Sequence, residues 1–138
     1  MREFKFRAWD TEREVMARVN HLGLSDYEVR MEDNECVCWT APHPYVCKLM
    51  QYIGLKDINN KDIYEGDIIR ITVDGDSRKV GEVVYKDCGF YIHIPNKYFE
   101  DYHEITDTYK IEDMGGIINL KQSFEVIGNV YENPDFLK

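Results

Sequence analysis

The feature that most constrains the fold of this chain is a series of short segments between residues 45 and 131. The segments are rich in β-branched and aromatic residues, and tight turns separate them. The clearest segments are 67–73 (DIIRITV), the pair 79–87 and 89–94, and 123–131. Strands this short and this closely spaced are typical of a small barrel or sandwich, because closure of the sheet removes exposed strand edges. The sequence therefore predicts a mainly β fold.

A smaller, β-rich N-terminal lobe is predicted before this series. Residues 3–10 (EFKFRAWD) alternate apolar and polar side chains with the period of a strand, and residues 14–20 can return beside them. Residues 27–40 contain two short candidate strands, with Asp33 and Asn34 as the turn between them.

Two prolines in the stretch APHP mark a boundary, which divides the chain into the lobe at 1–44 and a second domain at 45–138. The second domain contains an acidic insertion near 96–120. Residues 96–116 are rich in acids and tyrosines and have weak periodicity, so we expect a long loop with a helical turn there. After the last strand, Asn133 can cap a short helical turn, and Pro134 suits its first position.

The stretch IYEGDIIRI places two acids around one glycine, at Glu65, Gly66 and Asp67. Such a pattern fits a catalytic carboxylate pair, a metal site or the entrance to a strand. A chain that enters a bent strand needs a residue tolerant of positive φ, and Gly66 is one. Asp67 can accept hydrogen bonds from backbone amides of the turn, and no histidine is near in sequence. We therefore interpret the stretch as a strand entrance, with Tyr64 and Ile68 packing inward.

The four cysteines need an account, because C-x-C-x4-H-x3-C (Cys36, Cys38, His43 and Cys47) contains ligands for tetrahedral zinc. The spacing lacks the paired C-x2-C knuckles of strong zinc motifs. On a strand, Cys36 and Cys38 would share one face, and small buried thiols are common in cores. We therefore expect no metal. Nor do we expect a catalytic thiol at Cys88, because its turn has no basic cluster or helix N-terminus.

The charge balance narrows the classes of partner. Lys and Arg total 17, Asp and Glu total 26, and the formal net charge is −9. A nucleic-acid-binding domain usually carries a basic stripe, and here the basic residues are scattered, so direct binding to nucleic acid or to an anionic membrane is disfavoured. The N-terminus has no apolar signal region and no segment is long enough to span a bilayer, so we expect a cytoplasmic protein with reduced thiols.

Three separated stretches resemble a known family when they are taken in order. They are FKFRAWD at 4–10, LMQYIGLKDINNKDIYEGDIIRI at 49–71 and FEVIGNVYENPDFL at 124–137. Together they resemble the YopX family of bacteriophage and prophage proteins, over nearly the whole chain from Phe4 to Leu137. The chain departs from the family at Asn60, where the family often has glycine. The matching residues are Gly54, Leu55, Asp57, Tyr64, Glu65, Gly66, Asp67 and Ile68, then Ile127, Gly128, Asn129, Val130, Tyr131, Glu132, Asn133 and Pro134.

The resemblance implies an SH3-type β-barrel in the C-terminal part, a smaller N-terminal part and an origin in a mobile element. It implies no activity, cofactor or catalytic residue, because members of the family have been described as of unknown function. No phosphate loop, nucleophile elbow or zinc helix motif is present in the sequence either, so an enzyme is the least favoured reading.

The leading hypothesis is a non-enzymatic module that binds a protein of the bacterial host through exposed aromatic side chains beside an acidic stretch. This rests on fold-level analogy with other SH3-like barrels. The same tyrosines also fit ordinary barrel and loop packing. The candidate partner-binding residues are Tyr91, Tyr98, Phe99, Glu100, Asp101, Tyr102, Glu104 and Tyr109.

The alternative is an acidic decoy that occupies a host nucleic-acid-binding protein. It rests on the net charge and on an acidic cluster, which also fits a solvated surface. The sequence leaves the oligomeric state open and implies no cofactor. The cluster comprises Glu100, Asp101, Glu104, Asp107, Glu112 and Asp113.

Overall fold

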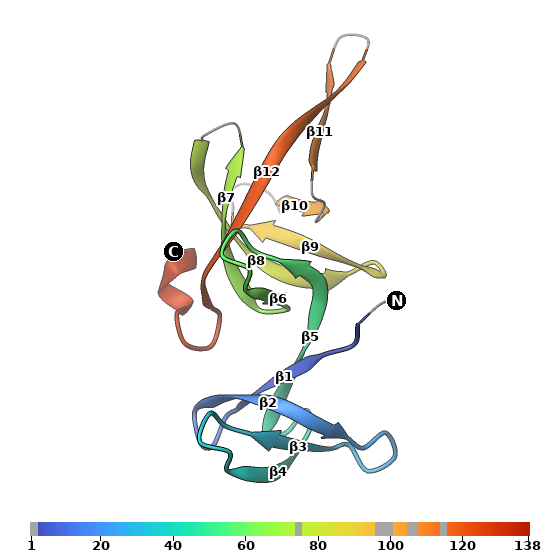
Figure 1. The fold of residues 1–138 in the computed structure, drawn as a ribbon, viewed down its shortest axis with the longest axis vertical. Coiled ribbons are helices and arrows are strands. Elements are labelled where there is room, and N and C mark those ends of the chain that lie inside the picture. The colour runs from blue at the N-terminus through green and yellow to red at the C-terminus, as the bar shows by residue number, and fades with distance from the viewer. Residues whose placement is uncertain (1–2, 74–75, 96–100, 105–107, 114–115) are drawn as a thin grey trace. The chain divides into compact units, whose positions relative to one another are not determined.

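The computed structural model describes residues 3–73, 76–95, 101–104, 108–113 and 116–138. These residues form twelve β-strands and one short 3-10 helix, so the prediction of a mainly β fold is confirmed. The strands form two antiparallel six-stranded sheets, ordered β4-β3-β2-β1-β5-β6 and β10-β9-β8-β7-β12-β11 (Figure 1). No helix among the described residues has the length and apolar character that a membrane span requires.

The chain divides into two compact units, Met1–Gly54 and Leu55–Lys138. The boundary lies further along the chain than residue 44, because the strand after the APHP turn pairs with β1 over five consecutive residues, from Phe6–Gln51 to Asp10–Cys47. The strands of the first sheet are β1 (Phe6–Asp10), β2 (Val15–Leu22), β3 (Glu28–Glu32), β4 (Cys38–Pro42), β5 (Cys47–Lys56) and β6 (Asp62–Tyr64).

Unit 1 has a small core on one face of its sheet. The strand register explains which residues form this core. Residues that are paired across neighbouring strands, such as Ala8 and Ala17 or Met31 and Trp39, lie on the same face of the sheet. The two predicted strands within 27–40 are confirmed as β3 and β4. The core comprises Ala8, Ala17, Val29, Met31, Ala41 and Cys47, with Val19, Leu22, Trp39, Val46 and Leu49 packed against them.

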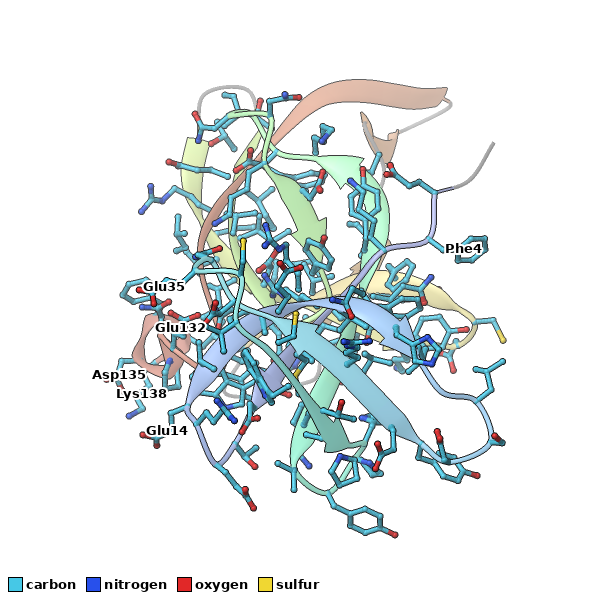
Figure 2. The ribbon with its side chains drawn as sticks, turned by 60° about the horizontal axis from the view of Figure 1, so that its bottom comes forward. Phe4, Glu14, Glu35, Glu132, Asp135 and Lys138 are labelled. Atoms are coloured by element: carbon cyan, nitrogen blue, oxygen red, sulfur yellow. The ribbon has the colours of Figure 1, made fainter. Side chains whose placement is uncertain are left out.

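Unit 2 contains the strand series that the sequence predicts. The segment at 67–73 and the pair at 79–87 and 89–94 are confirmed as strands, and the segment at 123–131 is a strand as far as Asn129. Asn133 precedes the final helical turn, and Pro134 is its first residue, as predicted. The elements are β7 (Asp67–Val73), β8 (Asp76–Lys86), β9 (Gly89–Ile94), β10 (Asp101–Glu104), β11 (Thr108–Asp113), β12 (Gly116–Asn129) and η1 (Pro134–Leu137). Figure 2 shows Asp135 and Lys138 together at η1, where their charged groups lie 2.6 Å apart.

The core of unit 2 is made mostly of β-branched residues. Ile68 and Ile69 are fully buried, as is Ile63, whereas Tyr64 is only half-buried, so Ile63 and not Tyr64 packs inward beside Ile68. The expected helical turn in the acidic insertion is wrong for the described residues, because 101–104 and 108–113 are strands that pair with β9 and β12.

Candidate functional site

The acidic motif around Gly66 is a structural turn. Gly66 has a φ of +79°, so the predicted positive φ is confirmed. The buried carboxylate of Asp67 accepts the amide of Tyr64 at 2.8 Å, as expected for a strand entrance. The backbone of Gly66 also donates to the carbonyl of Val83 and accepts from the amide of Val130, both at 2.9 Å. The turn therefore joins the start of β7 to β8 and to the end of β12.

Asp57, from the stretch GLKD, holds the next turn of unit 2. Its Oδ1 accepts the amides of Asn59 and Lys61 at 2.9 and 2.8 Å, and its Oδ2 accepts the amide of Val126 at 3.0 Å. Burial by itself raises the pKa of this carboxyl, but the three amides and the charge of Lys61 outweigh burial and lower the pKa overall. Asn60 takes a φ of +64° in this turn.

Asn129, from the stretch FEVIGNVYENPDFL, holds the turn that follows β12. Its Oδ1 accepts the amides of Tyr131 and Glu132 at 3.0 and 2.9 Å, and its Nδ2 donates to Glu132 Oε1 at 3.2 Å. The expectation that the Asn133 side chain caps the helical turn is wrong. Its Oδ1 accepts the amide of Asn129 at 3.3 Å instead, so the asparagine closes the preceding turn.

Asp10, from the stretch RAWD, holds a turn of unit 1 through hydrogen bonds of the same kind. Its Oδ1 accepts the amides of Glu12 and Arg13 at 2.9 and 2.8 Å, and its Oδ2 accepts Trp39 Nε1 at 2.7 Å. The guanidinium of Arg13 lies 4.7 Å from the centre of the Trp39 ring. The polar motif residues Asp10, Asp57, Asp67 and Asn129 therefore stabilise turns. We look for a binding surface among other residues.

The four cysteines differ in their exposure to solvent. Cys36, Cys38 and Cys88 are exposed, and only Cys47 is buried. The expected shared strand face of Cys36 and Cys38 is wrong, because Cys36 lies in the turn before β4 with a φ of +62°. Cys47 donates its thiol to the carbonyl of Ala41 at 3.7 Å, and burial, followed by the charge of Asp10, raises the pKa of this thiol. Across the described ranges, no three His, Cys, Asp or Glu side chains form a group that could hold a metal ion.

The outer face of β8, β9 and β10 gathers aromatic and charged side chains. The register places Glu82, His93 and Tyr102 in one row across the three strands. Tyr91 lies two residues from His93, and Lys86 shares the face with Glu82 by strand alternation. These side chains are partly exposed, whereas Val83 and Ile92 on the opposite face are buried. We call Glu82, Lys86, Tyr91, His93 and Tyr102 the aromatic face.

Contacts within the aromatic face organise its rings. The ring of Tyr102 stacks on His93 with centroids 4.7 Å apart and an interplanar angle of 24°. Lys86 Nζ lies 4.0 Å from the centroid of the same tyrosine, within reach of a cation–π interaction. Burial raises the pKa of the Glu82 carboxyl, and the charge of His93 acts in the opposite direction. The face thus presents ordered rings flanked by one acid and one cation, which suits it to binding.

The structure brings together part of the predicted partner-binding set. Tyr91 pairs with Glu104, and Tyr102 lies beside them on β10. Asp101 is also on β10, and Tyr109 is on β11 at the opposite end of the sheet order. The candidates Tyr98, Phe99 and Glu100 lie outside the described residues, as does Asp107 of the acidic cluster.

Sequence reasoning missed Glu82, Lys86 and His93. A partial signal for them existed, because Glu82 is next to the buried Val83 and His93 is next to the buried Ile92, as in a half-buried strand. That alternation identifies an outer face, but it does not reveal that β10 pairs beside β9 and brings Tyr102 onto His93.

Unit 1 carries a separate polar hollow that the sequence did not predict. Its volume is about 360 Å³, and the outer face of β2, β3 and β4 forms it. Register places His21 opposite Arg30 and Arg30 opposite Thr40. The hollow is lined by His21, Asp26, Glu28, Arg30, Cys38, Trp39 and Thr40.

One family model and two solved structures match this chain. The model of the YopX protein family matches residues 5–138. The crystal structure of protein EF1440 from Enterococcus faecalis has a TM-score of 0.60 and 23% identity, and the alignment covers 100% of each chain. The structure of YopX from Bacillus subtilis has a TM-score of 0.57 and 23% identity, over 97% of this chain and 98% of that one. No curated protein matches this chain. The chain belongs to the YopX family.

Proposed function

We propose that this chain is a non-enzymatic interaction module, encoded by a phage or prophage, that binds a protein in the cytoplasm of the bacterial host through the aromatic face. The observation that carries the proposal is the stacking of Tyr102 on His93 with Lys86 over the same ring, on side chains that stay partly exposed. Ordered aromatic rings at a protein surface are typical anchors of protein–protein interfaces.

The composition of the face supports protein binding. A tyrosine offers a large amphipathic surface with few rotatable bonds, so little conformational entropy is lost when a partner immobilises it. Here the stacking on His93 already restricts the Tyr102 ring. Glu82 and Lys86 supply charges of both signs beside the rings, which would fix the register of a partner more than its affinity.

We further propose that the strands of unit 2 form the SH3-type barrel that the family resemblance implies. The turn at Gly66 supports this reading, because its backbone bonds both to β8 and to the residue after β12, and so ties elements from the two sides of β7 together. In such a barrel the buried Val83 and Ile92 face the core, and the aromatic face is turned outward.

The acidic decoy remains the second candidate, and the net charge of −9 is its support. The described members of the acidic cluster lie on strands at the two ends of the sheet order, Asp101 and Glu104 on β10, Glu112 and Asp113 on β11. A decoy needs its charges gathered on one surface, so this placement favours the interaction module.

A pull-down from host lysate tests the proposal, with wild-type chain and two variants as baits. Tyr102→Ala removes the stacked ring of the aromatic face. Tyr45→Ala is the matched control, because it makes the same chemical change at an 83% exposed position in unit 1. We expect a protein that wild type and Tyr45→Ala capture and Tyr102→Ala loses. Equal capture by all three baits, with mass spectrometry as the readout, contradicts the proposed surface.

A further inference from the structure

The polar hollow of unit 1 lies on the face of the sheet that is turned away from the core. Along β3, Val29 and Met31 are buried, so Glu28 and Arg30, which alternate with them, point to the opposite face. Thr40 of β4 is opposite Arg30 and is also exposed. The hollow therefore brings a carboxylate, a guanidinium and a hydroxyl group around a space of about 360 Å³, which is within the range of small-molecule sites.

A β-bulge brings a histidine into the hollow. The pairing of β2 with β3 shifts between Val19 and His21. As a result His21, and not Asn20, is opposite Arg30, while Leu22 still packs against the core. Bulges commonly re-aim a side chain in this way. The imidazole and the guanidinium are thus neighbours, and both can donate hydrogen bonds to one anionic group.

The turn between β2 and β3 fixes a carboxylate at the hollow. Asp26 Oδ1 accepts the amide of Glu28 at 3.1 Å, and the amide of Gly23 donates to the carbonyl of Glu28 at 2.8 Å. The carboxylate of Asp26 occupies the space beside Gly23, where a Cβ would collide with it. The hollow therefore has an acidic side, at Asp26 and Glu28, and a basic side, at His21 and Arg30.

Glu28 and Arg30 differ from the neighbouring charges on the same face. Arg18 and Glu32 are opposite each other on β2 and β3, and their charged groups lie 3.8 Å apart. Within the part of the chain that the structure describes, the side chains of Glu28 and Arg30 form no ion pair and no hydrogen bond. Two residues of a strand span about 6.6–6.8 Å, so one small molecule that carries both charges can reach both groups.

We propose that the hollow binds a small α-amino acid as its zwitterion. The α-carboxylate accepts hydrogen bonds from Arg30, His21 and Thr40, and a guanidinium suits it because it can donate two parallel bonds to a carboxylate. The α-ammonium group pairs with Glu28 and Asp26. A simple anion would be repelled by the two acids, and a simple cation by Arg30. The site belongs to unit 1, so it does not depend on the aromatic face of unit 2.

Titration of the isotope-labelled full chain with L-serine tests the proposal, with the NMR shifts of the β2, β3 and β4 amides as the readout. Two analogues each remove one charge, since 3-hydroxypropionate lacks the ammonium group and ethanolamine lacks the carboxylate. Each should bind at least about tenfold more weakly than L-serine, because one side of the hollow loses its partner. Absence of saturable shifts with L-serine overturns the proposal. Equal binding of 3-hydroxypropionate also overturns it, in favour of a plain anion site.

Matched substitutions on β2 and β3 locate the site. Arg30→Gln and Glu28→Gln each remove one charge of the hollow and should weaken L-serine binding at least about tenfold. Arg18→Gln and Glu32→Gln make the same changes on the same face but outside the hollow, and should leave the affinity unchanged. The spectrum of each variant without ligand shows whether unit 1 is folded, and the analogue series needs no variant. Equal losses in the control variants contradict the assignment of the site.

Discussion

The carboxylate of Asp57 accepts the amide of Val126 at 3.0 Å, although 69 residues separate them in the sequence. The same carboxylate holds the turn from Asn59 to Lys61. One side chain therefore fixes a local turn and also joins it to the last strand of unit 2. An aspartate at this place in the motif therefore serves the fold.

Asp57→Asn should lower the free energy of unfolding by about 1–3 kcal/mol at pH 7, because an amide cannot accept on both of its heavy atoms and a buried amide would lose its partner. The folded-state pKa of Asp57 is lowered, so its stabilisation is complete above the ordinary pKa of about 3.9 and is lost as pH falls through the folded value. Urea titrations should show a difference between wild type and variant that shrinks below about pH 4. A difference that stays constant with pH would contradict the role given to the charge.

Trp39→Phe should destabilise unit 1 through the loss of one hydrogen bond to a charged group, at a cost of about 1.5–3 kcal/mol. The phenyl ring fills much of the indole site, but Asp10 Oδ2 loses the donor that lies 2.7 Å away. Hydrogen exchange of the β1 and β4 amides measures the effect. Asp10→Asn in the Trp39→Phe background should then cost less than Asp10→Asn alone, and strictly additive effects would show that the two residues do not act together.

Asn129→Asp should destabilise the turn after β12, because it removes the Nδ2 donor and sets a carboxylate against Glu132. We expect a loss of roughly 1–2 kcal/mol at pH 7, measured by thermal or chemical unfolding. Glu132→Gln in the same chain should recover part of the loss, since the glutamine amide can donate to the new carboxylate. Absence of any recovery would indicate that the like charges are not the cause.

Gly66→Ala should cost about 1 kcal/mol or more, because a φ of +79° is strained for any residue with a Cβ. Gly89→Ala is the matched control, since a Cβ there meets nothing closer than 3.5 Å and its φ is not in the left-handed region. The midpoint of denaturant unfolding compares the two variants. If Gly89→Ala is destabilised as much as Gly66→Ala, the positive φ at Gly66 is not the cause of the loss.

Local patterns in the sequence predicted much of the fold. The β-branched run 67–73, the turn at Asp87 and Cys88 and the Asn133–Pro134 helix start all have signals within a few residues. Two features have no local signal. β5 belongs to unit 1 through its pairing with β1, and β10 and β11 are strands because β9 and β12 lie beside them. Pairing between distant segments decides such cases, and periodicity in a single segment does not report it.

The candidate site was predictable only in part. Tyr91 and Tyr102 stand out as tyrosines in the sequence, and the fold brings them to adjacent strands. His93 and Glu82 acquire their roles only from register, since the row that joins them to Tyr102 comes from three separate strands. Tyr109 carries the same side chain as Tyr102, yet lies at the other end of the sheet order. Residue type suggested the surface, and strand order determined its members.

The measurement that tests the central claim most directly is the dissociation constant of the captured partner at low and high salt, for three forms of the chain. They are wild type, Tyr102→Ala, and a neutralised form with Glu100→Gln, Asp101→Asn and Glu104→Gln. If the aromatic face carries binding, Tyr102→Ala should weaken affinity by about 2 kcal/mol or more, roughly thirtyfold, and salt should matter little. Long-range attraction is screened within about 8–10 Å at physiological salt, so a decoy would bind far more weakly at high salt. A steep salt dependence, a large loss in the neutralised form and no change in Tyr102→Ala would contradict the account.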